Sequence, residues 1–220
     1  MRITAVGGED AISNLHMTAT LGAMRTYVRS DNGRRSMDGW LNGLRDGHAF
    51  VTNGPLVEMT VNGSIAGETL ELAAGTGTVL VSARVRSITP LTRAFLVYNG
   101  QEVAEIPLSE NRQSGEFQGE VEISGSGWIH LRAVGNPEEH FPLDADFAQG
   151  FTNPVWIIVD GAPIQDRASA EYGIRWVDKL TEMALEWPGW RSQDEIDHVL
   201  GQFQEARKVY ERLAEGGREM

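Results

Sequence analysis

A two-residue hydrophobic period that begins near Leu56 constrains the fold more than any other feature of this sequence. In the runs Val57–Val61 and Val79–Val85, an apolar residue occupies every second position and mainly polar residues lie between. Side chains of a β-strand point alternately to its two faces, so this pattern is typical of strands with one face in a core and one in solvent. The sequence therefore predicts a β-sheet protein from this point onward.

Asparagine-glycine pairs mark two tight turns within this region. Asn62-Gly63 follows the first alternating run, and Asn99-Gly100 separates the runs 95–98 and 102–106. This dipeptide suits two-residue hairpin turns, in which both turn residues take positive φ angles. Both positions are predicted to be β-hairpins.

Further strands are predicted at residues 117–123, 128–134 and 155–159, while residues 135–153 are expected to form a long loop. Seven or so short strands with turn signals between them, and no helical segment interposed, favour a sandwich over a parallel sheet. The predicted fold class is mainly β with α, and its centre is an antiparallel, Ig-like β-sandwich over residues 56–163.

Residues 1–55 have a different pattern, which predicts a small α/β segment. Ile3–Val6 is predicted to be a short strand that ends in Gly7-Gly8 and two acids, as an interior strand of an α/β protein does. A second strand is expected at Met24–Val28. Ser36 is a predicted N-cap of a short helix that ends at Gly47.

Residues 164–220 are predicted to form a C-terminal helical hairpin. The first helix carries an apolar stripe at steps of three and four residues, and Pro188-Gly189 ends it. Ser192 and Glu195 form a capping box for the second helix. The stripe of the first helix consists of Tyr172, Trp176, Leu180, Met183 and Trp187.

Charge and composition exclude several classes of partner. The formal net charge of −12 leaves no basic surface for a phosphate backbone or an anionic lipid, so neither nucleic acid nor membrane is an expected partner. The absence of cysteine excludes disulfides and thiolate metal sites. No signal peptide is recognisable at the start of the chain, which is expected to be soluble, and its compartment stays open.

Glu9, Asp10 and His16 are the leading candidates for chemistry. Carboxylates at the end of a strand with an imidazole nearby are where α/β barrels place metal ligands, because loops converge on that face. The alternative is a solvated turn with an isolated histidine, and three potential ligands from one loop do not by themselves make a catalytic metal site.

Two other constellations have weaker support. The loop after residue 135 contains four acids and a histidine, but it lacks the regular ligand spacing of an EF-hand, and a solvated acidic loop is the simpler interpretation. Trp128, His130 and Arg132 share one face of a strand, where they would form either a sugar-stacking platform or a packing surface. The loop residues are Glu138, Glu139, His140, Asp144 and Asp146.

Several stretches resemble the C-terminal part of metallohydrolases related to the carbaryl hydrolases CehA and McbA, members of the polymerase-and-histidinol-phosphatase (PHP) superfamily. The resemblance extends over nearly the whole chain, and its most specific piece is Phe50-Val51-Thr52-Asn53-Gly54-Pro55. The other stretches are Ala5–Asp10, Asn14–His16, Arg25–Val28, Gly43–Ala49, Gly127–Ile129 and Leu131–Ala133.

The resemblance implies an α/β barrel that binds divalent metals, Zn or Mn, of which this chain would contain only the last part. Asp10 takes the place of a late acidic ligand and His16 that of its histidine partner, although the family's usual spacing is Asp-x-His and Ile12 stands at that position. An early His-x-His motif is also typical of the family, and no histidine pair here has that spacing. The histidines are His16, His48, His130, His140 and His198.

The leading hypothesis is therefore the C-terminal part of a metal-dependent hydrolase with an accessory sandwich and little or no activity alone. Half a metal site is expected to bind metal weakly. The alternatives are a non-catalytic sandwich that binds carbohydrate or a protein partner, and a structural role in which apolar helix faces dock on a missing barrel or on another copy of the chain. An isolated barrel strand also predicts a homo-oligomer formed through residues 1–55, or association with a missing N-terminal barrel domain.

Overall fold

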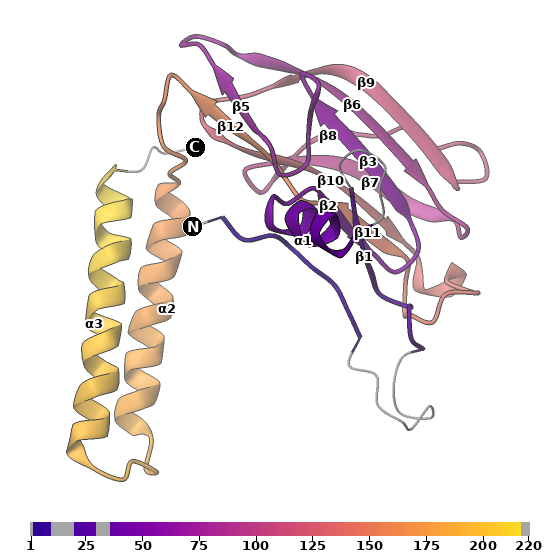
Figure 1. Cartoon of the computed structure of the whole chain (residues 1–220). Coiled ribbons are helices and arrows are strands. Elements are labelled where there is room, and N and C mark those ends of the chain that lie inside the picture. The colour runs from indigo at the N-terminus through magenta and orange to yellow at the C-terminus, as the bar shows by residue number, and fades with distance from the viewer. Residues whose placement is uncertain (1, 10–19, 30–35, 217–220) are drawn as a thin grey trace. The chain divides into compact units, whose positions relative to one another are not determined.

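The computed structural model describes residues 2–9, 20–29 and 36–216, and it is mainly β with three α-helices in that part of the chain (Figure 1). The chain divides into two compact units, Met1–Ala162 and Pro163–Met220. The first unit contains all the strands, in two sheets, and the second is a helical hairpin.

The larger sheet has eight strands and is built around β10. One side of β10 pairs with β7, which in turn pairs with β8. The other side of β10 pairs with β12 along its first half and with β11 along its second half, after which β5 joins β12, and β2 and β1 follow β11. The strands are β1 (Arg25–Val28), β2 (Ala49–Thr52), β5 (Thr69–Leu72), β7 (Leu91–Tyr98), β8 (Gln101–Glu105), β10 (Gly127–Gly135), β11 (Gln149–Thr152) and β12 (Val155–Val159).

The smaller sheet has four antiparallel strands in the order β4-β3-β6-β9. The alternation that defines β6 is confirmed, since its odd-numbered residues are buried and its even-numbered residues are exposed. The strands are β3 (Leu56–Val61), β4 (Ser64–Ile65), β6 (Thr78–Arg86) and β9 (Ser114–Glu122).

Both predicted hairpin turns are confirmed. The φ angles are +47° and +86° at Asn62-Gly63, and +48° and +85° at Asn99-Gly100, as a two-residue turn of this kind requires. Each asparagine side chain also binds a neighbouring strand. Asn62 Oδ1 accepts a hydrogen bond from Leu80 N at 2.8 Å, and Asn99 Oδ1 accepts one from Trp128 N at 3.0 Å.

One hydrophobic core joins the two sheets, and it consists of alternate residues from both. Full burial of an aliphatic side chain contributes about 1.5–3 kcal/mol, so this core is the main favourable term for the first unit. Its fully buried members include Val61, Val81 and Val85 of the smaller sheet and Leu96, Ile129 and Leu131 of the larger one.

The antiparallel sandwich predicted from the sequence is confirmed only as two sheets with a common core. The larger sheet is mixed, because β5 pairs with β12 in the parallel direction. Residues 135–153 were expected to form a loop, and they contain β11 and a 3₁₀ turn at Pro137–Glu139. The β11 sequence has no alternation that would have identified it, since Gly150 lies in its middle.

Residues 2–9 contain no strand, and the prediction of one at Ile3–Val6 is wrong. This segment, here called the strap, is held by side chains instead of a backbone ladder. Ala5 N donates to Asn153 Oδ1 at 2.7 Å, and Gly7 N donates to Thr26 Oγ1 at 2.8 Å. The barrel remnant expected for residues 1–55 is not shown by the described residues, where β1 and β2 belong to the eight-stranded sheet.

The helix predicted after Ser36 is confirmed as α1 (Met37–Arg45). Ser36 Oγ accepts a hydrogen bond from Gly39 N at 3.0 Å, which satisfies one of the free amides at the helix start. The helix ends before Gly47, whose φ of +77° is readily adopted only by glycine.

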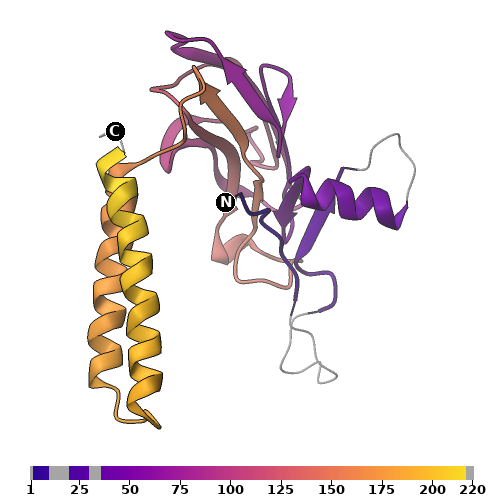
Figure 2. The ribbon, with the colours of Figure 1, turned by 60° about the vertical axis from the view of Figure 1, so that its left-hand side comes forward.

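The second unit is the predicted helical hairpin, formed by α2 (Arg167–Glu186) and α3 (Gln193–Gly216), which lie side by side in Figures 1 and 2. The buried residues of α2 are small, and a Cβ added at Gly173 would lie 2.6 Å from the Tyr210 ring, so the helices approach closely there. The buried residues are Ala170, Gly173, Val177 and Ala184. Among the described residues, no helix has both the length and the apolar character needed to cross a bilayer.

Asn153 provides a test of how the first unit is held together. Its side chain is 2% exposed, and its Nδ2 donates to the Ala5 and Ala49 carbonyls at 3.2 and 3.0 Å in addition to the bond accepted from Ala5 N. Asn153→Ala removes three hydrogen bonds and leaves the Ala5 amide and carbonyl without these partners, while the Ala49 carbonyl keeps its bond from Asn153 N. We therefore expect a loss of about 2–3 kcal/mol in unfolding free energy. Asn111→Ala is the matched control, because Asn111 makes its hydrogen bonds in an exposed turn. Urea unfolding measures both, and equal effects would contradict the assignment.

Candidate functional site

The two predicted metal ligands, Asp10 and His16, lie outside the described residues. Their neighbour Glu9 is described, and its carboxylate accepts hydrogen bonds from the backbone amides of Met24 and of Gly22, the latter at 3.1 Å. Both oxygens of Glu9 therefore bind the chain itself. In the described part of the chain, no three His, Asp or Glu side chains gather as a metal site would require.

The acidic loop after β10 spreads its charges over separate partners. Glu139 forms an ion pair with Arg112. Asp144 Oδ2 accepts a hydrogen bond from Thr20 N, and this bond is the main reason why the pKa of Asp144 is lowered. His140 Nδ1 lies 3.2 Å from the Leu143 carbonyl oxygen. Glu139 and Asp144 therefore bind separate partners and do not converge on one point.

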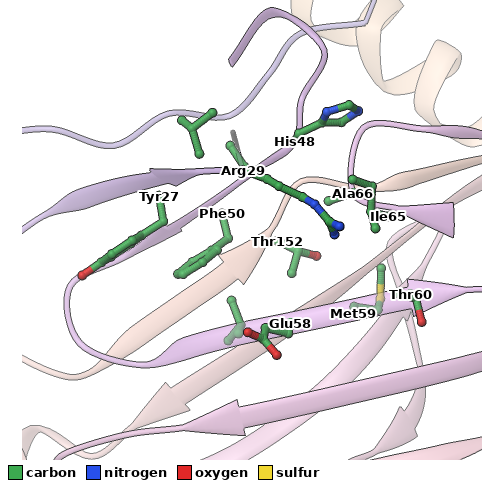
Figure 3. Close-up of a pocket in the computed structure, with 13 residues that line it drawn as sticks. Tyr27, Arg29, His48, Phe50, Glu58, Met59, Thr60, Ile65, Ala66 and Thr152 are labelled. Carbon is green, nitrogen blue, oxygen red and sulfur yellow. The ribbon is translucent and has the colours of Figure 1, made fainter. Parts of the chain in front are cut away.

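A pocket of about 550 Å³ lies where edges of the two sheets approach one another (Figure 3). The larger sheet contributes β1 and β2, and the smaller sheet contributes β3 and the β4 hairpin. The lining residues that Figure 3 labels are Tyr27, Arg29, His48, Phe50, Glu58, Met59, Thr60, Ile65, Ala66 and Thr152.

The pocket follows from the shortness of β4. This strand pairs only with Thr60 and Val61, so β3 has no β4 partner along Leu56–Met59. Hydrogen-bonding directions alternate along a strand, and since Val61 faces β4 at the tight turn, the backbone groups of Val57 and Met59 point to the same side. The pocket therefore lies beside an unpaired length of strand.

Aromatic rings form one wall of the pocket. Tyr27 and Phe50 are directly opposite each other in the β1–β2 register, so their side chains share a face of the sheet. Their rings stack with centroids 4.9 Å apart and planes 9° from parallel. Phe50 is also directly opposite Thr152 in the β2–β11 register, so the Thr152 side chain lies on the same face of the sheet as the two rings.

Charged and polar groups surround this apolar wall. Figure 3 shows the Arg29 side chain extending across the pocket from the end of β1, with Glu58 on the β3 side. The His48 imidazole also contributes to the lining, and its buried Nδ1 has no hydrogen-bond partner among the described residues. The pocket thus combines an aromatic surface, a cation, an anion and β3 backbone groups that have no strand partner in the described part of the chain.

Sequence reasoning did not identify this pocket. Its residues come from five separate segments, and only the pairing of β2 with β11 and the length of β4 bring them together. The sequence signal for this pocket was the pair of aromatic residues Tyr27 and Phe50. Their opposite positions in β1 and β2 depend on the strand register, which local spacing does not report.

The predicted surface of Trp128, His130 and Arg132 lies on the opposite face of β10 from the core, whose residues alternate with them. Trp128 and His130 have ring centroids 5.6 Å apart, and His130 contacts Phe151 edge-on at 6.5 Å. Burial, with a smaller contribution from the Arg132 charge, lowers the pKa of His130 to about 4. This histidine is therefore neutral at pH 7, and its ring contacts Trp128 and Phe151.

Comparison with known proteins identifies no relative: no family model, curated protein or solved structure matches this chain.

His130 makes stability depend on pH in a defined direction. Its pKa is about 4 in the folded chain, against 6.5 for a solvent-exposed histidine of the unfolded chain. As the pH falls below 6.5, the unfolded chain therefore binds a proton before the folded chain does. The contribution of the neutral ring to the free energy of unfolding is complete above pH 6.5 and is lost as the pH falls towards 4. At pH 5 the free energy of unfolding should already be lower by about 2 kcal/mol. His130→Gln should flatten this part of the curve in urea unfolding between pH 7.5 and 5. The exposed His198 is the control, and an equal flattening by His198→Gln would rule out the assignment.

Proposed function

We propose that residues 1–162 form a non-catalytic binding module that holds an extended peptide segment of a protein partner along the free edge of β3. The observation that supports this most is the position of the pocket, which lies beside the length of β3 that β4 leaves unpaired. An extended peptide can add a strand to such an edge, where backbone hydrogen bonds give affinity and a neighbouring pocket selects a side chain.

The chemistry of the pocket suits this ligand. The stacked Tyr27 and Phe50 rings and Met59 offer an apolar surface for one large side chain of the peptide. Arg29 and Glu58 offer one charge of each sign at its border, so both a peptide carboxylate and a peptide cation can be recognised. The volume of about 550 Å³ lies in the range of pockets that enclose a small ligand, and holds one aromatic side chain with its backbone.

Carbohydrate is the competing ligand class, because an aromatic ring beside charged hydrogen-bonding groups also suits a sugar. The Tyr27 side chain is 41% exposed and would be the stacking surface. A sugar needs no strand edge, however, and the unpaired backbone groups of Val57 and Met59 would then be without a role. For this reason the peptide is the proposal and the sugar is an outcome of its test.

Filling the pocket tests this proposal. Peptides selected from a random displayed library against the full chain provide the probe, and their affinity is measured by calorimetry. Ala66 lines the pocket, so Ala66→Trp should weaken binding at least about tenfold by occupying it. Ala74→Trp is the matched control, because Ala74 is exposed in the turn before β6.

Equal affinity for both tryptophan variants would overturn the pocket as the peptide site. A chain that selects no peptide but binds sugars on a glycan array, and loses that binding in Tyr27→Ala, would instead establish the carbohydrate alternative.

We also propose, from the resemblance, that the chain is the C-terminal part of a PHP-type metal-dependent hydrolase, in which the two sheets are an Ig-like accessory sandwich and a barrel domain is the missing partner. One observation favours this second candidate: three stretches that resemble the family adjoin one another. The strap binds β1 through Gly7 and Thr26, and Thr26 lies opposite Val51 of the Phe50–Pro55 run.

Metal titration tests the hydrolase candidate. The family's metal would have Asp10 and His16 as its ligands here, and because Glu9 already binds backbone amides, a two-ligand site should hold Zn²⁺ or Mn²⁺ weakly. Calorimetry of the full chain should show weak binding that Asp10→Ala removes, while Asp160→Ala, in an exposed turn, leaves it unchanged. Binding that survives Asp10→Ala, or hydrolysis by the isolated chain, would refute this assignment.

A further inference from the structure

The apolar stripe of α2 does not pack against α3. Its five residues are at least one-third exposed, including Tyr172 at 55%, Trp176 at 50% and Trp187 at 61%. The face of α2 towards α3 consists of the residues that directly follow the stripe residues in sequence. Among these, Gly173, Val177 and Ala184 are buried. The stripe, defined as Tyr172, Trp176, Leu180, Met183 and Trp187, is therefore a second apolar face of the same helix.

The stripe is ordered and extensive. Tyr172 and Trp176 meet edge to face with centroids 6.4 Å apart, and the Arg175 guanidinium lies 5.8 Å from the centre of the Tyr172 ring. A buried aromatic side chain covers about 150–250 Å², so three half-exposed ones with Leu180 and Met183 present several hundred Å². Contiguous apolar patches of about this size on a protein surface mark interaction sites.

The charges that border the stripe are arranged by sign along the helix. The position just before each stripe residue lies on the border away from α3, and a charged residue occupies each of these five positions. Glu171 comes first and forms an ion pair with Arg167. Arg175 and Lys179 are next, and Glu182 and Glu186 follow. The last four are exposed. From Arg175 to Glu186 the border is therefore basic in its first half and acidic in its second half.

This arrangement is complementary to a reversed copy of itself. Two α2 helices that pack antiparallel about a twofold axis near Leu180 bring the basic half of each border beside the acidic half of the other. In a parallel pair, the twofold axis would place each border beside the α3 side of the partner's stripe, so only the antiparallel pair brings the two borders together. An isologous contact about a twofold axis is also the commonest way in which identical chains associate.

We propose that the chain forms a homodimer through the α2 stripe, with the two hairpins joined as an antiparallel four-helix assembly. The occupant of the stripe is a second copy of this chain, because the apolar residues and the charge border are both self-complementary in one orientation. The surface differs from residues 1–55, where the sequence predicted self-association, and the proposal does not depend on the binding pocket.

Charge reversal provides a decisive test. Arg175→Glu/Lys179→Glu makes the whole border acidic, and Glu182→Lys/Glu186→Lys makes it basic from Arg175 onward. Each double variant should be at least about tenfold weaker in self-association, because like charges then face each other. An equimolar mixture should restore the dimer as a heterodimer. Analytical ultracentrifugation of the full chain at low salt, at concentrations on the order of 1 to 100 µM, measures self-association of each double variant and of their mixture.

The matched control is Lys208→Glu/Arg212→Glu, which makes the same charge change on exposed residues of α3 and should leave the dimer intact. Leu180→Glu should abolish the dimer, while Leu185→Glu, outside the stripe, should not. Circular dichroism verifies that the helices persist in each variant. A monomeric unaltered chain, or a dimer that survives both Leu180→Glu and the border reversals, would overturn the proposal and locate any association elsewhere, including residues 1–55.

Discussion

The buried amide of Asn153 is the contact on which the arrangement of the first unit depends. β11 and β12 are nearly one continuous strand along β10, but the register shifts by one residue between them, where Asn153-Pro154 interrupts the ladder. A break inside a sheet leaves backbone groups without partners, and burying them unpaired is costly. At this break Asn153 N donates to the Ala49 carbonyl and the Pro154 carbonyl accepts from Gly67 N. The Asn153 side chain adds bonds to both the strap and the start of β2.

The same break explains why the larger sheet divides. On one side of the break, β11 pairs with β2, which pairs with β1. On the other side, β12 pairs with β5 in the parallel direction. Asn53 reinforces the first branch, since its Oδ1 accepts from Gln149 N at 2.8 Å and its Nδ2 donates to the Phe147 carbonyl at the same distance. With β1 and β2 fixed in this way, and β4 too short to cover β3, the pocket is a direct result of the topology.

Local chemistry was readable from the sequence, and non-local pairing was not. The alternation of β6, the two Asn-Gly turns and the Ser36 cap each depend on a few consecutive residues, and each was predicted correctly. The parallel pairing of β5, the unpaired strap and β11 depend on partners distant in the chain, so no local pattern reports them. The pocket belongs to this second class. The α2 stripe was visible as a period, but only the structure shows that Gly173 and its neighbours make the contact with α3.

The strap also changes how adjacent residues of one motif should be compared. Gly7 and Gly8 look equivalent as a turn signal, yet a Cβ at Gly7 would collide with the Val51 and Met24 side chains, whereas one at Gly8 would have nothing within 4 Å among the described atoms. Because the strap is held by side-chain amides and hydroxyls, its sequence is restricted by clearance above the sheet and not by β propensity. A side chain should therefore be tolerated at Gly8 and disfavoured at Gly7, although the two glycines are neighbours in one turn motif.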